Sequence, residues 1–237
     1  MDISLLETTI REMCDEVESR PSGATDWHAL TEAQLVYEAM VCIASSQTRY
    51  EVAVAMAERL RDLGLCEFGP QFDRESYFQT VLAVLEQPVS ITDANGNGRT
   101  ARIRFRNRLA RLLTENATRT ARSNCTLRTL LDMSGSASEA RARIVQNVSG
   151  LGPKQASLFL RRIGYCSDLA VLDVHILDYL RLAKGLVIKA GSLGRLQTYE
   201  RTEDQFRRIA EEFGYSVGCV DLATWVTMRT AKREALL

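Results

Sequence analysis

The chain has 237 residues, of which 46% are hydrophobic and 25% are charged, with 30 basic and 30 acidic side chains. This composition is ordinary for a globular protein, and no apolar run approaches the roughly 20 residues needed to cross a bilayer. The acidic, amphipathic N-terminus lacks the basic start and apolar core of a signal peptide. We therefore expect a cytoplasmic protein that is not attached to a membrane.

Helical patterns follow one another along nearly the whole chain. Apolar residues recur every 3.6 residues over 3–17, and Thr31 is suited to cap a buried helix over 31–44. The sequence DANGNG at 93–98 is the clearest loop, and no stretch shows the sustained alternation of a β-strand. The chain is therefore predicted to be all-α, with ten or more short helices. The further predicted helices span 51–64, 75–87, 99–121, 127–134, 138–148, 154–164, 173–185, 201–214 and 218–237.

The neutral total charge hides an uneven distribution. Residues 1–86 hold 16 acidic and 6 basic side chains, whereas residues 87–237 hold 14 acidic and 24 basic ones. Nine arginines and one acidic residue fall within 99–128, and arginine supplies 26 of the 30 basic residues. Because guanidinium groups make forked contacts with phosphates, this segment either forms a face for a polyanion or consists of solvated helix surfaces.

The six cysteines are spread along the chain without any Cys-x-x-Cys pair. This spacing argues against an iron–sulfur cluster and against a zinc ribbon. We expect buried, reduced thiols and no required cofactor.

A tight turn between two predicted helices carries the most informative motif, SGLGPK. Gly150 and Gly152 permit positive φ and close backbone approach, and Pro153 suits the first position of the second helix. The pattern over about 140–163 is a helix–hairpin–helix, and the N–H groups at such a helix start bind phosphate. Lys154 is one of four lysines in the chain. It is either a solvated lysine or a nucleophile, because the helix dipole favours a neutral amine that can form a Schiff base.

Asp173 precedes a predicted amphipathic helix, nineteen residues after Lys154. Its simplest role is that of an N-cap. A carboxylate held in this way can also stabilise positive charge that develops on a sugar, so the two roles are compatible. His175, two residues further on, fits a structural or DNA-facing position better than a catalytic one.

These residues carry a family resemblance. The motif GLGPK, followed by LDVH with its aspartate nineteen residues after the lysine, resembles the helix–hairpin–helix DNA glycosylase superfamily. Within it, the chain is most similar to the short 8-oxoguanine DNA glycosylase/AP lyases of archaea and some bacteria, from about residue 35 to about residue 228. Four further stretches support this: MVCIASSQTRYEVAVAMAERL, RIRFRNRLARLL, ASLFLRRIGYCSDLAVLDVHIL and GCVDLATWVTM.

The resemblance also implies an architecture and a division of roles. It implies two helical domains, residues 28–167 and residues 1–27 with 168–237, and an active site in the cleft between them. Lys154 would attack C1′ of the target nucleotide, and Asp173 would assist departure of the base. The remaining implied roles are DNA-backbone contacts by Gly150, Leu151 and Gly152; a wedge at Gln47, or else Arg49; DNA contacts by His175, Arg104 and Arg106; a base pocket at Trp225 and Asp221, with a core position as the alternative for Trp225; and a K⁺ or Na⁺ ion on the backbone carbonyls of Gln146, Val148 and Leu151.

The implied function is excision of a damaged base, first of all 8-oxoguanine, from double-stranded DNA, followed by β-elimination. We expect a monomer associated with the nucleoid. The C-terminal sequence MRTAKREALL differs from the Thr-Gly turn and terminal lysine of the 8-oxoguanine branch. A glycosylase for another modified base, such as hypermodified cytosine in phage DNA, is therefore one alternative, and a non-catalytic DNA-binding hairpin module is another.

Overall fold

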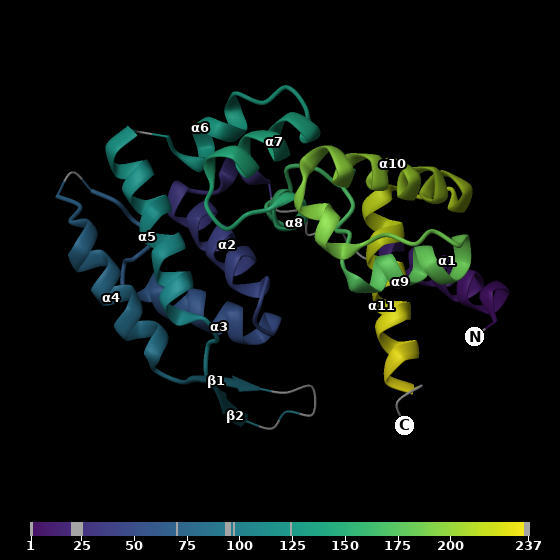
Figure 1. Ribbon diagram of the computed structural model, residues 1–237, viewed down its shortest axis with the longest axis horizontal. Coiled ribbons are helices and arrows are strands. Elements are labelled where there is room, and N and C mark those ends of the chain that lie inside the picture. Colours follow the sequence, from purple (N-terminus) through teal and green to yellow (C-terminus); the bar gives the residue numbers. More distant parts are fainter. Residues whose placement is uncertain are drawn as a thin grey trace. The chain divides into compact units, whose positions relative to one another are not determined.

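The computed structural model confirms the predicted helical class. It describes residues 2–19, 26–69, 71–92, 96, 98–123 and 125–234. Within these ranges the chain forms eleven α-helices, two short 3₁₀-helices and one two-stranded sheet (Figure 1). No helix in this described part is both long enough and apolar enough to cross a bilayer. The chain divides into two compact units, which we call the central unit (28–151) and the terminal unit (1–27 with 152–237).

The central unit is built from paired helices. Its longest buried run lies in α2, where Leu35, Val36 and all residues from Ala39 to Ala44 are buried, and α2 packs against α3 while α4 packs against α5. The predicted N-cap is confirmed, because Thr31 and Gln34 form a reciprocal capping box at the start of α2. The elements of this unit are η1 (Trp27–Ala29, which begins at the unit boundary), α2 (Glu32–Ser45), α3 (Tyr50–Asp62), α4 (Arg74–Glu86), β1 (Val89–Thr92), β2 (Gly98–Ala101), α5 (Arg106–Ser123), α6 (Leu127–Asp132) and α7 (Ala137–Asn147).

A β-hairpin in the central unit differs from the sequence prediction. β1 and β2 pair antiparallel, with Val89 opposite Ala101, and α5 begins only at Arg106, so the helix predicted from residue 99 was wrong over its first seven residues. Most of the predicted loop at 93–98 lies outside the described residues. Four-residue strands are too short to establish a periodicity. Phe105, with φ of +54°, is in the left-handed region, which interrupts a continuous helix before α5.

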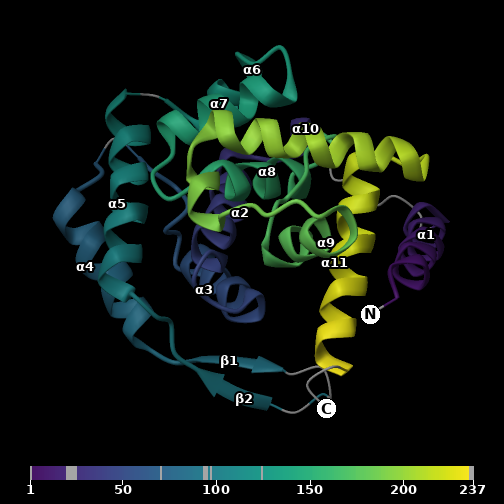
Figure 2. The same cartoon turned by 45° about the vertical axis from the view of Figure 1, so that its right-hand side comes forward.

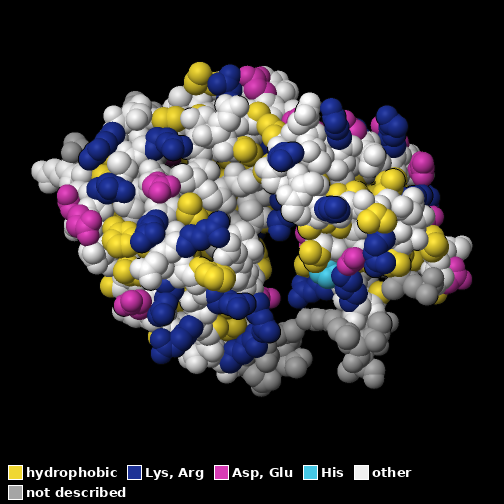
Figure 3. Space-filling view, viewed as in Figure 1, with side chains coloured by type: hydrophobic (Ala, Val, Ile, Leu, Met, Phe, Trp, Pro, Cys, Tyr) yellow, Lys and Arg dark blue, Asp and Glu magenta, His cyan; other side chains and the backbone are white. Residues whose placement is uncertain are grey.

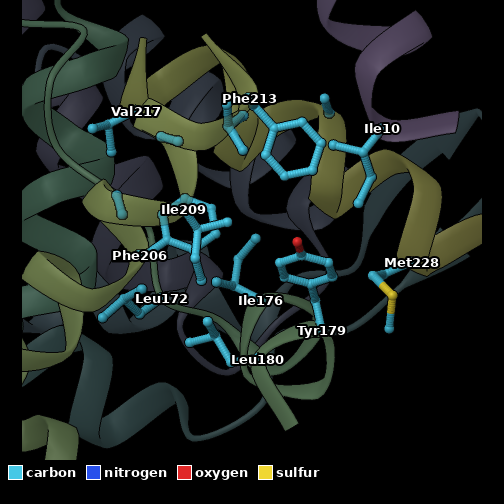
Figure 4. Close-up of a cluster of buried hydrophobic side chains, with 14 of the residues drawn as sticks. Ile10, Leu172, Ile176, Tyr179, Leu180, Phe206, Ile209, Phe213, Val217 and Met228 are labelled. Carbon is cyan, nitrogen blue, oxygen red and sulfur yellow. The ribbon is translucent and has the colours of Figure 1, made fainter. Parts of the chain in front are cut away.

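The terminal unit joins the two ends of the chain around one apolar core. α1 packs along α11, and α9 packs against the same helix (Figure 2). Figure 4 shows buried side chains of α1, α9, α10 and α11 meeting around Tyr179 and Phe206. The elements of this unit are α1 (Ile3–Ser19), α8 (Pro153–Arg162), α9 (Val174–Lys184), η2 (Ala190–Gly194), α10 (Leu196–Phe213) and α11 (Val217–Glu234). All six cysteines of the chain are free thiols, and four of them are buried.

The boundary between the units falls between residues 151 and 152, whereas the resemblance implied a boundary between 167 and 168. The difference concerns α8. This helix contacts α10 and η2, and its Arg161 bonds to Asp221 and to the carbonyl of Gly218, which all belong to the terminal unit. The second helix of the hairpin, with Lys154, therefore folds together with the segment that carries Asp173.

The start of α11 lies unusually close to the loop that follows α8. The N–H of Gly218 donates to the carbonyl of Ser167 at 2.9 Å, and a Cβ at Gly218 would lie 2.5 Å from that carbonyl oxygen. Only glycine permits this approach without a shift of the backbone.

We expect Gly218→Ala to lower the free energy of unfolding by about 1–3 kcal/mol, the usual cost of overpacking, even though alanine is the better helix former. Gly191→Ala is the matched control, because no described atom lies within 4 Å of a Cβ built there. Urea unfolding followed by circular dichroism would measure both variants. Equal stability of the two variants would contradict the prediction.

Candidate active site

The predicted helix–hairpin–helix is present, and it places Lys154 in the first turn of α8. α7 ends at Asn147 and α8 begins at Pro153, with the half-buried Lys154 next. Gly150 has φ of +94°, and a Cβ there would lie 3.0 Å from the side chain of Ile43. Gly152 does not use the freedom predicted for it, because it caps α8 with an ordinary φ of −73°. Only Gly150 is therefore required to be glycine by the turn.

Asp173 is confirmed as the N-cap of α9, and its carboxylate has three donors. Oδ1 accepts hydrogen bonds from the backbone N–H groups of His175 (2.8 Å) and Ile176 (3.2 Å). Oδ2 accepts a hydrogen bond of 2.9 Å from Nε1 of Trp225 on α11. Both oxygens of the half-buried carboxylate are thus fixed, one by its own helix and one by another helix.

The segment that leads to Asp173 has no regular secondary structure, yet its backbone is firmly held. Four consecutive N–H groups, from Ala170 to Asp173, donate hydrogen bonds. Their acceptors, in chain order, are Oε1 of Glu203 (2.9 Å), Oδ1 of Asp221 (2.9 Å), the hydroxyl of Tyr199 (3.1 Å) and the carbonyl of Val171 (2.7 Å). The first three acceptors are buried side chains of α10 and α11, so each bond is sheltered from water. The position of Asp173 is therefore set by the core of the terminal unit.

Asp221, which the resemblance placed in the base pocket, is engaged within the protein. It is 5% exposed, its Oδ1 accepts from the N–H of Val171, and its Oδ2 forms an ion pair with Arg161. Burial raises the pKa of Asp221 to about 6, although the neighbouring guanidinium acts in the opposite direction. The geometry gives Asp221 a structural role, because it ties α8, the helix of Lys154, to the segment of Asp173.

Three of the predicted DNA contacts of the central unit share one groove. Gln47, Arg104 and Gly150 line a groove together with Phe105 and Arg108. Figure 3 shows basic side chains, which in this unit are all arginines, collected over the part that carries β1, β2 and α5. Two other predicted contacts lie outside the groove. Arg49 is exposed at the start of α3, and Arg106 lines a neighbouring hollow that shares two residues with the groove.

Along the hairpin turn, carbonyls that accept hydrogen bonds from α5 alternate with carbonyls that do not. The carbonyl of Asn147 accepts from Arg119, and the carbonyl of Ser149 accepts from Nδ2 of Asn116 at 2.9 Å, so α5 covers both. The carbonyls predicted to hold the cation are those of Gln146, Val148 and Leu151, which are not the ones covered by α5. The carbonyl of Val148 also accepts from the N–H of Leu151 at 3.2 Å. Backbone carbonyl oxygens can replace the water shell of a monovalent cation such as K⁺ without any charged side chain.

A family model described as 8-oxoguanine DNA glycosylase matches residues 92–215, slightly more than half of the chain. The chain belongs to the 8-oxoguanine DNA glycosylase family. Two curated members of this family are 8-oxoguanine DNA glycosylase/AP lyases. The protein of Thermotoga sp. strain RQ2 is 36% identical over 91 residues, which are 38% of this chain and 43% of that protein. The protein of Thermoplasma volcanium is 40% identical over 87 residues, which are 37% of this chain and 40% of that protein. The matched stretch thus spans less than half the length of these relatives.

Solved structures of the 8-oxoguanine DNA glycosylase family share the fold of this chain. The enzyme of Thermotoga maritima has a TM-score of 0.66 at 24% identity, over 94% of this chain and 93% of that one. The 8-oxoguanine glycosylase/lyase of Methanocaldococcus jannaschii, in complex with a 15mer DNA that contains 8-oxoguanine, has a TM-score of 0.66 at 19% identity. That match covers 93% of this chain and 95% of the other. At these identities the comparison establishes the common fold.

In this 8-oxoguanine DNA glycosylase family member, several site residues escaped the sequence analysis. Phe105 is 59% exposed beside Arg104, whose guanidinium lies 5.8 Å from its ring centre. A lone aromatic residue within an arginine run was the signal that could have revealed it. Glu203 and Tyr199, which hold the backbone before Asp173, gave no such signal, because polar residues at helical spacing have no distinctive pattern.

His175 is less suited to contact a phosphate than the family resemblance implied. Its half-buried ring lies edge-to-face against Trp225, with the ring centres 6.0 Å apart. Burial lowers the pKa of His175, Lys232 and Arg229 lower it further, and the nearby Asp173 and Asp178 oppose this. The neutral form therefore predominates at pH 7, and a neutral imidazole offers little attraction to a phosphate.

The lowered pKa has a consequence for stability. His175 binds a proton less readily in the folded protein than in the unfolded chain. The stability that this difference contributes is therefore fully present above the unfolded pKa of about 6.5. It is lost as the pH falls through the lower pKa of the folded state. Thermal unfolding at pH 7.5 and pH 5.5 should show that the wild-type midpoint falls more on acidification than that of His175→Asn. Parallel shifts in the two proteins would contradict the prediction.

Proposed function

We propose that the protein is a DNA glycosylase with AP lyase activity, and that its substrate is 8-oxoguanine in double-stranded DNA. The observation that carries the proposal is the joint placement of Lys154 and Asp173. The lysine lies in the opening turn of the hairpin helix, the carboxylate is held by three donors, and both belong to one compact unit braced by α11. The names of the curated relatives support the choice of reaction and base.

The proposed reaction starts with extrusion of the target nucleotide, because C1′ cannot be reached inside a duplex. The amine of Lys154 attacks C1′ as the bond from C1′ to the base breaks, and the bonding electrons leave with the base. Asp173 stabilises the positive charge that builds on the sugar as this bond lengthens. The sugar ring then opens to a Schiff base on Lys154. Loss of a proton from C2′ with cleavage of the C3′–O bond nicks the strand.

The proposed DNA surface comprises the groove residues Gln47, Arg104, Phe105 and Arg108, with Arg106 and Arg49 near it. Gln47 is the first choice for the side chain that fills the gap left by the extruded base. The turn from Gly150 to Gly152 would offer backbone N–H groups to a phosphate. A K⁺ or Na⁺ ion on the carbonyls of Gln146, Val148 and Leu151 would supply a positive charge at the same turn. We expect one monomer to bind one lesion.

The substrate and the reaction are tested together by a panel of duplexes. The panel carries 8-oxoguanine opposite each base, uracil, alkylated purines and glucosylated hydroxymethylcytosine. We expect excision of 8-oxoguanine, and borohydride should trap a covalent adduct with the wild-type protein and none with Lys154→Gln, because only the lysine can form the imine. An adduct that persists in Lys154→Gln would remove Lys154 from its role.

The other outcomes of this panel separate the alternatives. Excision of another modified base, with trapping on Lys154, would replace 8-oxoguanine as the substrate and retain the mechanism. Binding without excision, and without cleavage of a preformed abasic site, would show a DNA-binding hairpin module that is not an enzyme.

The arginine groove predicts a measurable salt dependence of DNA binding. Each phosphate contact contributes about 0.9 to the slope of log K against log salt concentration. The double variant Arg104→Gln/Arg108→Gln should therefore have a slope smaller by about 2. Arg201→Gln, at an exposed position on α10, is the control. Fluorescence anisotropy at several salt concentrations would measure the slopes, and an unchanged slope in the double variant would exclude this groove as the phosphate contact.

A further inference from the structure

The third hydrogen bond of Asp173 comes from a residue that no capping rule predicts. A capping aspartate needs only one oxygen for its helix, and the torsion that rotates the carboxylate plane is soft. Here Oδ1 makes the capping bonds, while Oδ2 accepts from Nε1 of Trp225 at 2.9 Å, across 52 residues of sequence. Donors on both oxygens fix the plane of the carboxylate as well as its position.

The indole that makes this bond is itself held on two sides. The guanidinium carbon of Arg229 lies 4.8 Å from the centre of the ring, and the His175 ring meets it edge-to-face. Asp221 lies four residues before Trp225, so the two side chains share one face of α11. Asp221 holds the backbone N–H of Val171, and Trp225 holds the side chain of Asp173. The helix α11 thus holds the segment 171–173 by two hydrogen bonds.

We propose that Trp225 is a positioning residue, whose indole N–H orients the Asp173 carboxylate toward the sugar of the extruded nucleotide. This role rests on the proposed glycosylase function. An indole nitrogen is a neutral donor and accepts nothing, so it orients the carboxylate without cancelling its charge. A lysine or arginine in the same place would hold the carboxylate equally well but would offset the negative charge that the reaction needs.

The family resemblance had given Trp225 a different role, in the base pocket, where a tryptophan would stack on the extruded base. Stacking uses the face of the ring, whereas positioning uses only the N–H group. Trp225→Phe separates the two roles, because phenylalanine retains an aromatic face and lacks the donor.

The experiment measures two single-turnover rates with enzyme in excess over DNA. In Trp225→Phe, the excision rate should fall about tenfold or more, as expected for the loss of a hydrogen bond to a charged group. Cleavage of a preformed abasic site should stay within about twofold of wild type, because that step involves no departing base. Trp27→Phe is the matched control. Trp27 is the other tryptophan of the chain, and its ring packs against Tyr165 with the centres 5.2 Å apart. This variant should excise at the wild-type rate.

A spectroscopic measurement tests the contact independently of activity. In the Trp27→Phe protein, Trp225 is the sole tryptophan and reports on its own surroundings. Asp173→Asn in that background removes the charge next to Nε1 and should alter the wavelength or intensity of the emission. An identical spectrum would show that the hydrogen bond does not form and would overturn the proposal.

The kinetic outcomes distinguish this proposal from the proposed function. Wild-type protein that excises no base of the panel overturns the function, and the positioning role with it. Wild-type activity that is unchanged in Trp225→Phe overturns the positioning role alone. Equal losses of excision and of abasic-site cleavage would show general damage to the terminal unit, and would also overturn it.

Discussion

The buried ion pair between Arg161 and Asp221 links the helix of Lys154 to the segment of Asp173, the two candidate catalytic residues. Arg161 lies two turns after Lys154 on α8, and Asp221 binds the backbone two residues before Asp173. Removing either partner would leave a charge buried and unpaired, which typically costs about 3–5 kcal/mol. Asp221 can be buried, at 5% exposure, because a guanidinium and a backbone N–H donate hydrogen bonds to its two oxygens. The ion pair thus fixes the two ends of the candidate site through a single side chain of α11.

The charge asymmetry of the sequence does not correspond to an asymmetry between the folded units. The acidic residues of α1 fold with the C-terminal part of the chain, and residues 28–86 fold with the arginine-rich segment 99–128. Arg104 and Arg108 nevertheless line one groove of the central unit, because the link between β2 and α5 and the first turn of α5 present them together. Arginines that are spread along the sequence thus come together as a candidate binding surface only through this local geometry.

Local patterns in the sequence were sufficient for most of the helices and for the residues at their starts. Thr31, Lys154 and Asp173 each lie at a helix start that could be recognised from a few neighbouring residues. The β-hairpin was missed because its strands are four residues long. The contacts that hold Asp173 and Asp221 in place could not be predicted from the sequence for a different reason. Trp225 meets Asp173 across 52 residues and Arg161 meets Asp221 across 60, and no local pattern encodes a pairing of that kind.

Two aspartates of the terminal unit illustrate how different surroundings give different roles to the same type of side chain. Asp221 is almost fully buried and paired with a cation, and the charge of Asp173 is among the causes that raise its pKa. Among the described residues, the donors to the Asp173 carboxylate are neutral N–H groups, two from its own helix and one from Trp225. The charge of Asp221 is therefore balanced by Arg161 and serves the fold. The donors of Asp173 hold its carboxylate in place without opposing its charge, as its proposed role of stabilising a cationic sugar requires.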